Sequence, residues 1–157
     1  MRILGIDPGT GILGFGVVET GSKSHKMIDA GVIRTPAHQD LSLRLLTLYD
    51  ELSAIADQHK PDVMAVEKLF FARNVTTAMS VSHARGVVLL IGAQRGIPIY
   101  EYTPLQIKQS VTGYGRADKK QIQEMVRVLL RLREVPKPDD CADALAAALT
   151  HGALGAV

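Results

Sequence analysis

Two short apolar segments that each end on a carboxylate constrain the fold of this chain most strongly. The first is a strand-forming run at 2–6, followed at once by Asp7. The second, Val63-Met64-Ala65-Val66, ends in the same way on Glu67. Continuous apolar runs of this length are typical of strands that are covered on both faces. Because ligand sites in open α/β sheets lie at the carboxyl ends of the strands, the sequence predicts a site at this edge.

The remaining segments complete an α/β pattern. Strands are predicted at 2–6, 12–19, 26–34, 63–67 and 99–102, and helices at 40–59, from Asn74 or Thr76 to about 95, from 104 onward, after 118 and at 139–150. The predicted N-caps include Asp40, Thr103, Asp118 and, for the last helix, Asp139. A meander of strands followed by alternating helices and strands indicates a three-layer domain with a mixed sheet. We expect a single domain spanning 1–157.

The composition narrows the class of protein. Cys141 is the only cysteine, so an intrachain disulfide is excluded and a reducing compartment is favoured. The longest apolar run, Val87–Ile91, is far shorter than the roughly 20 residues of a membrane helix, and no secretory leader is apparent. These features predict a soluble, cytoplasmic protein without a membrane partner.

The charge distribution says more than the net charge of +2. Between Lys108 and Arg133, seven Lys and Arg residues stand against two acids. Such a basic segment suits an anionic ligand, although a solvated helix face is the ordinary alternative.

Four acids are candidates for chemistry. Asp7 and Glu67 end strands, and Asp140 and Asp143 are three residues apart on one predicted helix face. If the fold brings them together, protons or cations must neutralise them, because neighbouring carboxylates cannot all stay ionised. Oxygen ligands favour Mg²⁺ or Mn²⁺ over Zn²⁺. Two such ions about 4 Å apart form the usual clamp for attack on a phosphodiester.

Each acid also has an ordinary structural explanation. Asp7 could open the turn at Pro8-Gly9, where aspartate is common. Glu67 could pair on the surface with Lys68 or Arg73, and the aspartates of the last helix could complement its dipole. The agreement of two strands with one spaced acidic pair favours a functional site.

An ordered set of short motifs resembles the RuvC family of Holliday-junction endonucleases. The motifs are Gly5-Ile6-Asp7-Pro8-Gly9, Glu67 followed by Phe70, Ala84-Arg85-Gly86, Lys108-Gln109 and Asp140-x-x-Asp143-Ala144-Leu145-Ala146. The resemblance implies a ribonuclease-H-like fold with a five-stranded mixed sheet flanked by helices. It also implies a homodimer that nicks two opposed strands of a four-way junction and leaves 5′-phosphate and 3′-hydroxyl ends. The implied partner is a branch-migration motor complex (RuvAB).

The resemblance also implies roles for individual residues. Asp7, Glu67, Asp140 and Asp143 match the catalytic acids that hold the metal ions, Lys108 and Lys119 match basic residues near the scissile DNA, and Phe70 matches an aromatic that stacks on a base. Further candidates for phosphate contacts are Arg73, Arg116 and Lys120. The doublet Asp139-Asp140 leaves the identity of the third ligand open, and Phe70-Phe71 leaves the DNA-contacting aromatic open.

Two other functions have sequence support. Asp7-x-Gly9-Thr10-Gly11 also resembles the first phosphate loop of actin-like nucleotide-binding modules. Those modules need a second similar loop and two lobes, for which 157 residues are too few. A related nuclease acting on RNA–DNA hybrids is the nearest enzymatic alternative.

Overall fold

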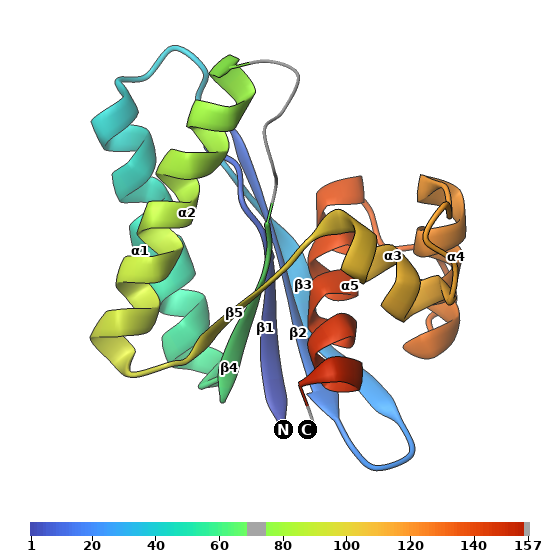
Figure 1. The fold of residues 1–157 in the computed structure, drawn as a ribbon. Coiled ribbons are helices and arrows are strands. Elements are labelled where there is room, and N and C mark those ends of the chain that lie inside the picture. The colour runs from blue at the N-terminus through green and yellow to red at the C-terminus, as the bar shows by residue number, and fades with distance from the viewer. Residues whose placement is uncertain (69–74, 156–157) are drawn as a thin grey trace.

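The fold is a five-stranded mixed sheet between two layers of helices, as the sequence predicts (Figure 1). The structure, a computed structural model, describes residues 1–68 and 75–155. The strands are β1 (Arg2–Asp7), β2 (Ile12–Thr20), β3 (His25–Arg34), β4 (Val63–Glu67) and β5 (Ile99–Tyr102). The helices are α1 (Leu41–His59), α2 (Val75–Arg95), α3 (Pro104–Thr112), α4 (Lys119–Leu129) and α5 (Asp139–Leu154).

The strand order β3-β2-β1-β4-β5 places the two acid-ending strands next to each other at the centre. The strands β1, β2 and β3 form the antiparallel meander, whereas β1, β4 and β5 pair in parallel. Both central strands are almost continuously buried, which explains why their sequences show no polar alternation.

The two faces of the sheet support separate cores. Helices α1 and α2 cover one face, and α3, α4 and α5 lie on the other (Figure 1). Because side chains alternate along a strand, Leu4 and Ile6 pack toward α1 and α2, whereas Ile3 packs with α5. The same alternation directs Asp7 toward the α5 side of the sheet.

A seam of glycines lets α5 lie close against β1 and β2. Gly5 pairs with Gly16 across the two strands, and Asp7 pairs with Gly14. A Cβ atom at position 5 would overlap the backbone oxygen of Ala144, and one at position 14 would overlap that of Asp140. Only glycine allows the helix backbone to approach the sheet this closely.

The helix starts agree with the predicted caps except at two places. Thr103 and Asp118 each form a capping box, and Asp40 occupies the N-cap position of α1 without a side-chain bond. The prediction of Asp139 as a cap is wrong, because Pro138 is the N-cap and the side chain of Asp139 points to other partners. Thr76 lies inside α2 and does not cap it, and the alternative cap, Asn74, lies outside the described residues.

Helix α2 is long and apolar enough, by length and composition alone, to cross a membrane. Over a stretch of 18 residues within this helix, the mean hydropathy reaches 1.3, and 22% of that stretch is buried within the structure. Uninterrupted apolar runs in the sequence did not identify this helix. Serine, threonine and glycine interrupt its apolar runs without adding charge. Ala84, Val88 and Ile91 nevertheless belong to the core between α2 and the sheet.

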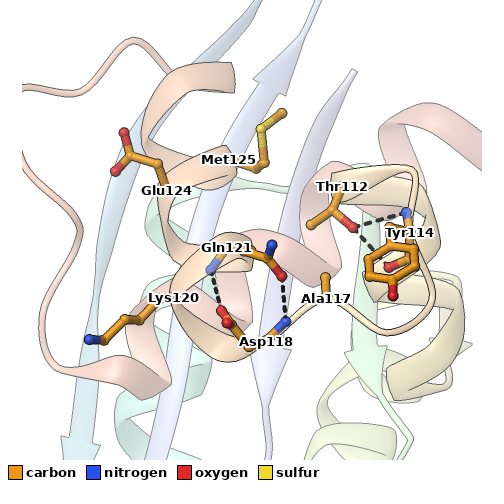
Figure 2. A pocket seen from close by; sticks show the side chains of 8 residues that line it. All are labelled: Thr112, Tyr114, Ala117, Asp118, Lys120, Gln121, Glu124 and Met125. Atoms are coloured by element: carbon orange, nitrogen blue, oxygen red, sulfur yellow. Dashed lines mark hydrogen bonds between the residues drawn. The ribbon is translucent and has the colours of Figure 1, made fainter.

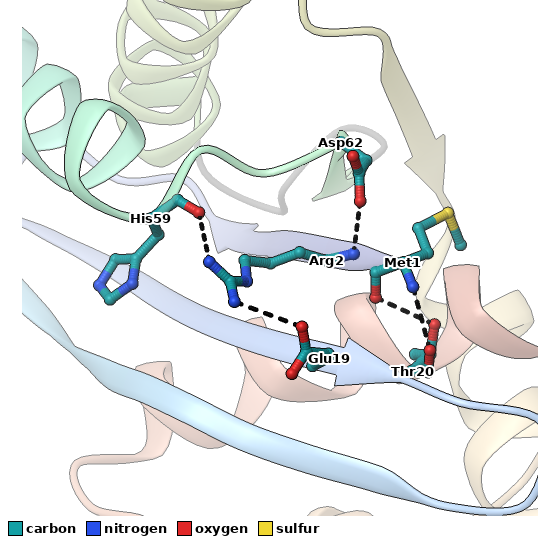
Figure 3. A network of polar contacts seen from close by, with 6 residues as sticks. All are labelled: Met1, Arg2, Glu19, Thr20, His59 and Asp62. Carbon is teal, nitrogen blue, oxygen red and sulfur yellow. Dashed lines mark hydrogen bonds and ion pairs between the residues drawn. The ribbon is translucent and has the colours of Figure 1, made fainter.

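The end of the sheet opposite the acids is fixed by Arg2 (Figure 3). Its guanidinium donates to the backbone oxygen of His59 at 2.9 Å and to the carboxylate of Glu19 at 3.3 Å. Its backbone N–H donates to the carboxylate of Asp62 at 2.7 Å. These contacts tie the start of β1 to β2 and to the chain that enters β4, so the two central strands begin in a fixed register.

Candidate active site

Asp7 and Glu67 lie side by side because β1 and β4 run parallel and in register. Ile6 pairs with Val66, and each strand places its acid directly after this pair. Their carboxyl groups lie close enough for each to shift the pKa of the other. The two strand-ending acids of the sequence therefore meet, as predicted.

Helix α5 brings the second pair of acids to the same place. The backbone of Asp140 lies directly over Gly14, the cross-strand partner of Asp7. Asp143 follows on the same side of the helix and lines a small cavity of about 40 Å³ together with Glu67 and Lys108. Sequence reasoning missed the role of Gly14, although the alternation of glycines in β2 was a visible signal.

Three carboxyl groups of this cluster, those of Asp7, Glu67 and Asp143, have raised pKa values. Burial, followed by the charges of Glu67, Asp143 and Asp140, raises the pKa of Asp7 to about 9. Burial and the charge of Asp143 raise the pKa of Glu67 to about 7, against the opposing effects of the Asp7 hydrogen bond, Lys119 and Lys108. Burial also raises the pKa of Asp143. Without a cation, the cluster must therefore hold protons.

The donor set fits a hard divalent cation. Within residues 1–68 and 75–155, no three acidic, histidine or cysteine side chains converge closely enough to hold a metal ion as they stand. The raised pKa values of Asp7 and Glu67 are those expected of neighbouring buried carboxyl groups that no cation neutralises. Buried carboxylate oxygens are ligands that Mg²⁺ and Mn²⁺ prefer. His151 has another partner, because its Nδ1 bonds to the hydroxyl of Tyr102 at 2.6 Å.

Lys119 is a basic group that pairs with acids of α5. It is the first residue of α4, whose start is fixed by the reciprocal bonds between Asp118 and Gln121 (Figure 2). Its Nζ lies 3.1 Å from Asp139 Oδ2 and 3.9 Å from Asp143 Oδ2. Burial lowers the pKa of Lys119, but the hydrogen bond to Asp139 and the charges of three aspartates raise it above its usual value.

The other predicted DNA-contacting residues are only partly described. Arg116 and Lys120 are exposed, and Lys120 lines a pocket of about 440 Å³ beside Tyr114 and Met125 (Figure 2). The predictions for Phe70, Phe71 and Arg73 fall outside the described residues.

The loop after Asp7 is held in place by buried polar contacts. The Thr10 hydroxyl donates to the backbone oxygen of Ser80 at 2.7 Å, and the Thr35 hydroxyl donates to the backbone oxygen of Thr10 at 2.6 Å. A Cβ atom at Gly9 would overlap the backbone oxygen of Ile12, so the turn itself requires glycine. No local sequence pattern indicates that Thr10 joins this loop to α2. Whether the small residues also admit a phosphate group stays a prediction.

Comparisons with known proteins identify relatives over nearly the whole chain. The family model described as Crossover junction endodeoxyribonuclease RuvC matches residues 3–151. A protein of that name from Desulfitobacterium hafniense is 60% identical over 151 residues, which cover 96% of this chain and 92% of the relative. The namesake from Pseudothermotoga lettingae is 54% identical over 154 residues, which cover 98% of this chain and 95% of the relative.

Solved structures agree with the sequence comparison. The structure named T. thermophilus RuvC in complex with Holliday junction substrate superposes with a TM-score of 0.95 at 36% identity, covering 99% of this chain and 94% of that one. A yeast mitochondrial Holliday junction resolvase superposes with a TM-score of 0.68 at 14% identity, covering 96% of this chain and 78% of the resolvase chain. This likeness shows a shared fold alone. The ribonuclease-H-like fold is thereby confirmed. Because family model, sequence relatives and superposition agree along its length, the chain belongs to the RuvC family of crossover junction endodeoxyribonucleases.

Proposed function

We propose that this protein is a divalent-metal-dependent endonuclease that resolves four-way DNA junctions by paired nicks, leaving 5′-phosphate and 3′-hydroxyl ends. The observation that carries the proposal is the buried cluster of carboxyl groups with raised pKa values at the ends of β1 and β4. Membership of the RuvC family supports junction DNA as the substrate over RNA–DNA hybrids and nucleotides. A cytoplasmic location and a branch-migration motor partner belong to the same proposal.

Each side chain of the cluster has a separate task. Asp7, Glu67, Asp140 and Asp143 would hold the cations, for which we propose two Mg²⁺ or Mn²⁺ ions. When bound, such ions supply an activated water and neutralise charge at the scissile phosphate. Lys119 keeps a positive charge beside these acids, where it stabilises the negative charge that develops on the phosphate.

The remaining basic side chains would hold the DNA backbone. Lys108 lines the same small cavity as Glu67 and Asp143, so it is placed to contact a phosphate next to the acids. Arg116 and Lys120 are exposed close to Lys119 in the chain and would neutralise flanking phosphates. For Arg73 as a phosphate contact and Phe70 as a base-stacking residue, the family resemblance is the support.

A second copy of the chain is the proposed partner on the α1–α2 side of the sheet. Large apolar side chains are exposed along these helices: Leu41, Leu43, Leu46, Val75, Met79 and Leu90. Exposed apolar patches of this kind mark contact sites, and a two-fold contact presents the same patch from both copies. A dimer would supply one set of acids for each of the two opposed strands.

The deciding experiment compares a synthetic four-way junction with a linear duplex of identical sequence. We expect the protein with Mg²⁺ or Mn²⁺ to nick the junction in two opposed strands and to leave the duplex intact. Denaturing gels with separate end labels on each strand identify the nicks and their termini, and chelator provides the metal-free control. Equal cleavage of the duplex would contradict structure selectivity, and nicks confined to one strand per junction would contradict the dimer.

The pKa values of Asp7 and Glu67 predict how pH and metal affect stability. Between the ordinary Asp pKa of 3.8 and the raised value of about 9, the metal-free folded protein binds a proton that the unfolded chain has released. The unfolding free energy therefore falls as pH rises through this window, by about 1.4 kcal/mol per pH unit for each such proton. Saturating Mg²⁺ replaces these protons, so its stabilising effect should grow with pH.

Thermal melts with chelator or with Mg²⁺, at about pH 5.5 and about pH 8, measure this effect. The Asp7→Asn variant is the matched comparison, because it has no carboxyl group to titrate at this position. A wild-type melting temperature whose pH dependence equals that of the variant would contradict the assignment.

A further inference from the structure

Asp139 carries contacts that the four-acid site does not use. Gln123 Nε2 donates to Asp139 Oδ1 at 3.0 Å, and Lys119 Nζ lies 3.1 Å from Asp139 Oδ2. Each carboxylate oxygen therefore has its own partner from α4. The same ammonium group is 3.9 Å from Asp143 Oδ2, so Lys119 lies between an acid of the site and Asp139.

These contacts contribute little to folding. The side chains of Lys119 and Asp139 are 56% and 60% exposed. Exposed ion pairs of this kind are worth roughly 0–1 kcal/mol, because water screens them and the long lysine side chain loses freedom. The contacts of Asp139 instead determine position, since they hold the flexible four-carbon side chain of Lys119 at one point beside the acids.

Asp139 does not belong to the acid cluster itself. The charges that raise the pKa of Asp7 are those of Glu67, Asp143 and Asp140, and the charge of Asp139 is the smallest of the influences on the pKa of Asp143. Both Asp139 oxygens are engaged with α4, whereas Asp140 lies over the partner strand of Asp7. Of the doublet Asp139-Asp140, the second residue is thus the one that joins the acids.

We propose that Asp139 is a positioning residue that, steadied by Gln123, holds the Lys119 ammonium group beside the scissile phosphate. This inference rests on the proposed nuclease function. While cations neutralise Asp143, its attraction for Lys119 weakens, and Asp139 is the anion that keeps the ammonium group in place. Asp139 acts through Lys119 and does not touch the substrate.

The kinetic experiment uses single and double variants of the full chain. We expect Asp139→Asn to lower kcat for junction nicking about tenfold, as for a displaced group, with KM and melting temperature unchanged. Asp139→Glu should recover most of this loss. Lys119→Met should lower kcat about 100-fold, and adding Asp139→Asn to it should cost less than about twofold, because coupled residues do not add. Glu124→Gln, which breaks an exposed pair with Arg127 on the same helix, is the control.

A second readout does not depend on nicking. Nitrogen-15 relaxation of the Lys119 ammonium group should show greater mobility in Asp139→Asn than in wild type or Glu124→Gln. Equal mobility of the Lys119 ammonium group in all three proteins would overturn the inference. So would a further loss of kcat of about tenfold when Asp139→Asn is added to Lys119→Met. If wild type does not nick junctions, the proposed function fails, while the mobility measurement still decides whether Asp139 positions Lys119.

Discussion

Asp7→Asn is expected to lower junction nicking by roughly 10⁴–10⁶-fold, the scale seen when a member of a catalytic group is removed, while junction binding is kept. Asparagine has the same shape but no negative charge, so it cannot share cations with Glu67 in the way a carboxylate does. Loss of the charge also reduces repulsion of the DNA phosphates, so affinity for the junction should stay the same or rise. Gel-shift titration with Ca²⁺ and single-turnover nicking with Mg²⁺ measure the two quantities separately.

The control for this substitution is Asp57→Asn, which removes a surface carboxylate paired with Arg95. This variant should nick as wild type does. Nicking by Asp7→Asn above a trace level would remove Asp7 from the catalytic group. A parallel loss of junction binding would instead assign Asp7 to DNA contact or to folding.

Gly14→Ala should reduce both stability and nicking, although position 14 carries no functional group. The added Cβ would overlap the backbone oxygen of Asp140 and lie 3.1 Å from the Cβ atom of that residue. Overpacking of this kind typically costs about 1–3 kcal/mol. The first turn of α5 must move away from β2, and a displacement of about 1 Å at a catalytic group can cost about 100-fold in rate.

Thermal melts and single-turnover nicking of the folded fraction separate these two effects. Gly21→Ala is the matched control, because a Cβ atom there would meet only ordinary van der Waals contact with Ser24. If Gly14→Ala folds and nicks at the wild-type rate, the close contact between β2 and α5 does not set the position of Asp140.

The sequence predicted those parts of the fold that depend on local patterns. The apolar runs before Asp7 and Glu67 identified the central strands, and Thr103 and Asp118 marked helix starts through their capping boxes. The prediction that Asp7 and Glu67 meet also succeeded, because parallel strands present their carboxyl ends at one edge. Asp139 was misassigned because an aspartate at a helix start caps its own helix in most settings, whereas here α4 offers it two other partners.

What the sequence could not supply are contacts between distant segments. Nothing local indicates that Thr10 bonds to Ser80 or that Gly14 faces Asp140, because these pairs form only when α2 and α5 pack on opposite faces of the sheet. The exposed apolar surface of α2 could not be predicted from the sequence for a related reason. Run length alone does not show which side of a helix the neighbouring elements leave open.

The placement of the acids on α5 has a consequence for how the molecule opens. Apart from its two ends and Asp143, this helix is buried throughout from Cys141 to His151, against both central strands. Segments with this much burial exchange their amide hydrogens only when the whole domain comes apart. Asp143 is therefore carried by a segment that opens only with the whole domain, and Asp140 lies one residue before the start of that segment.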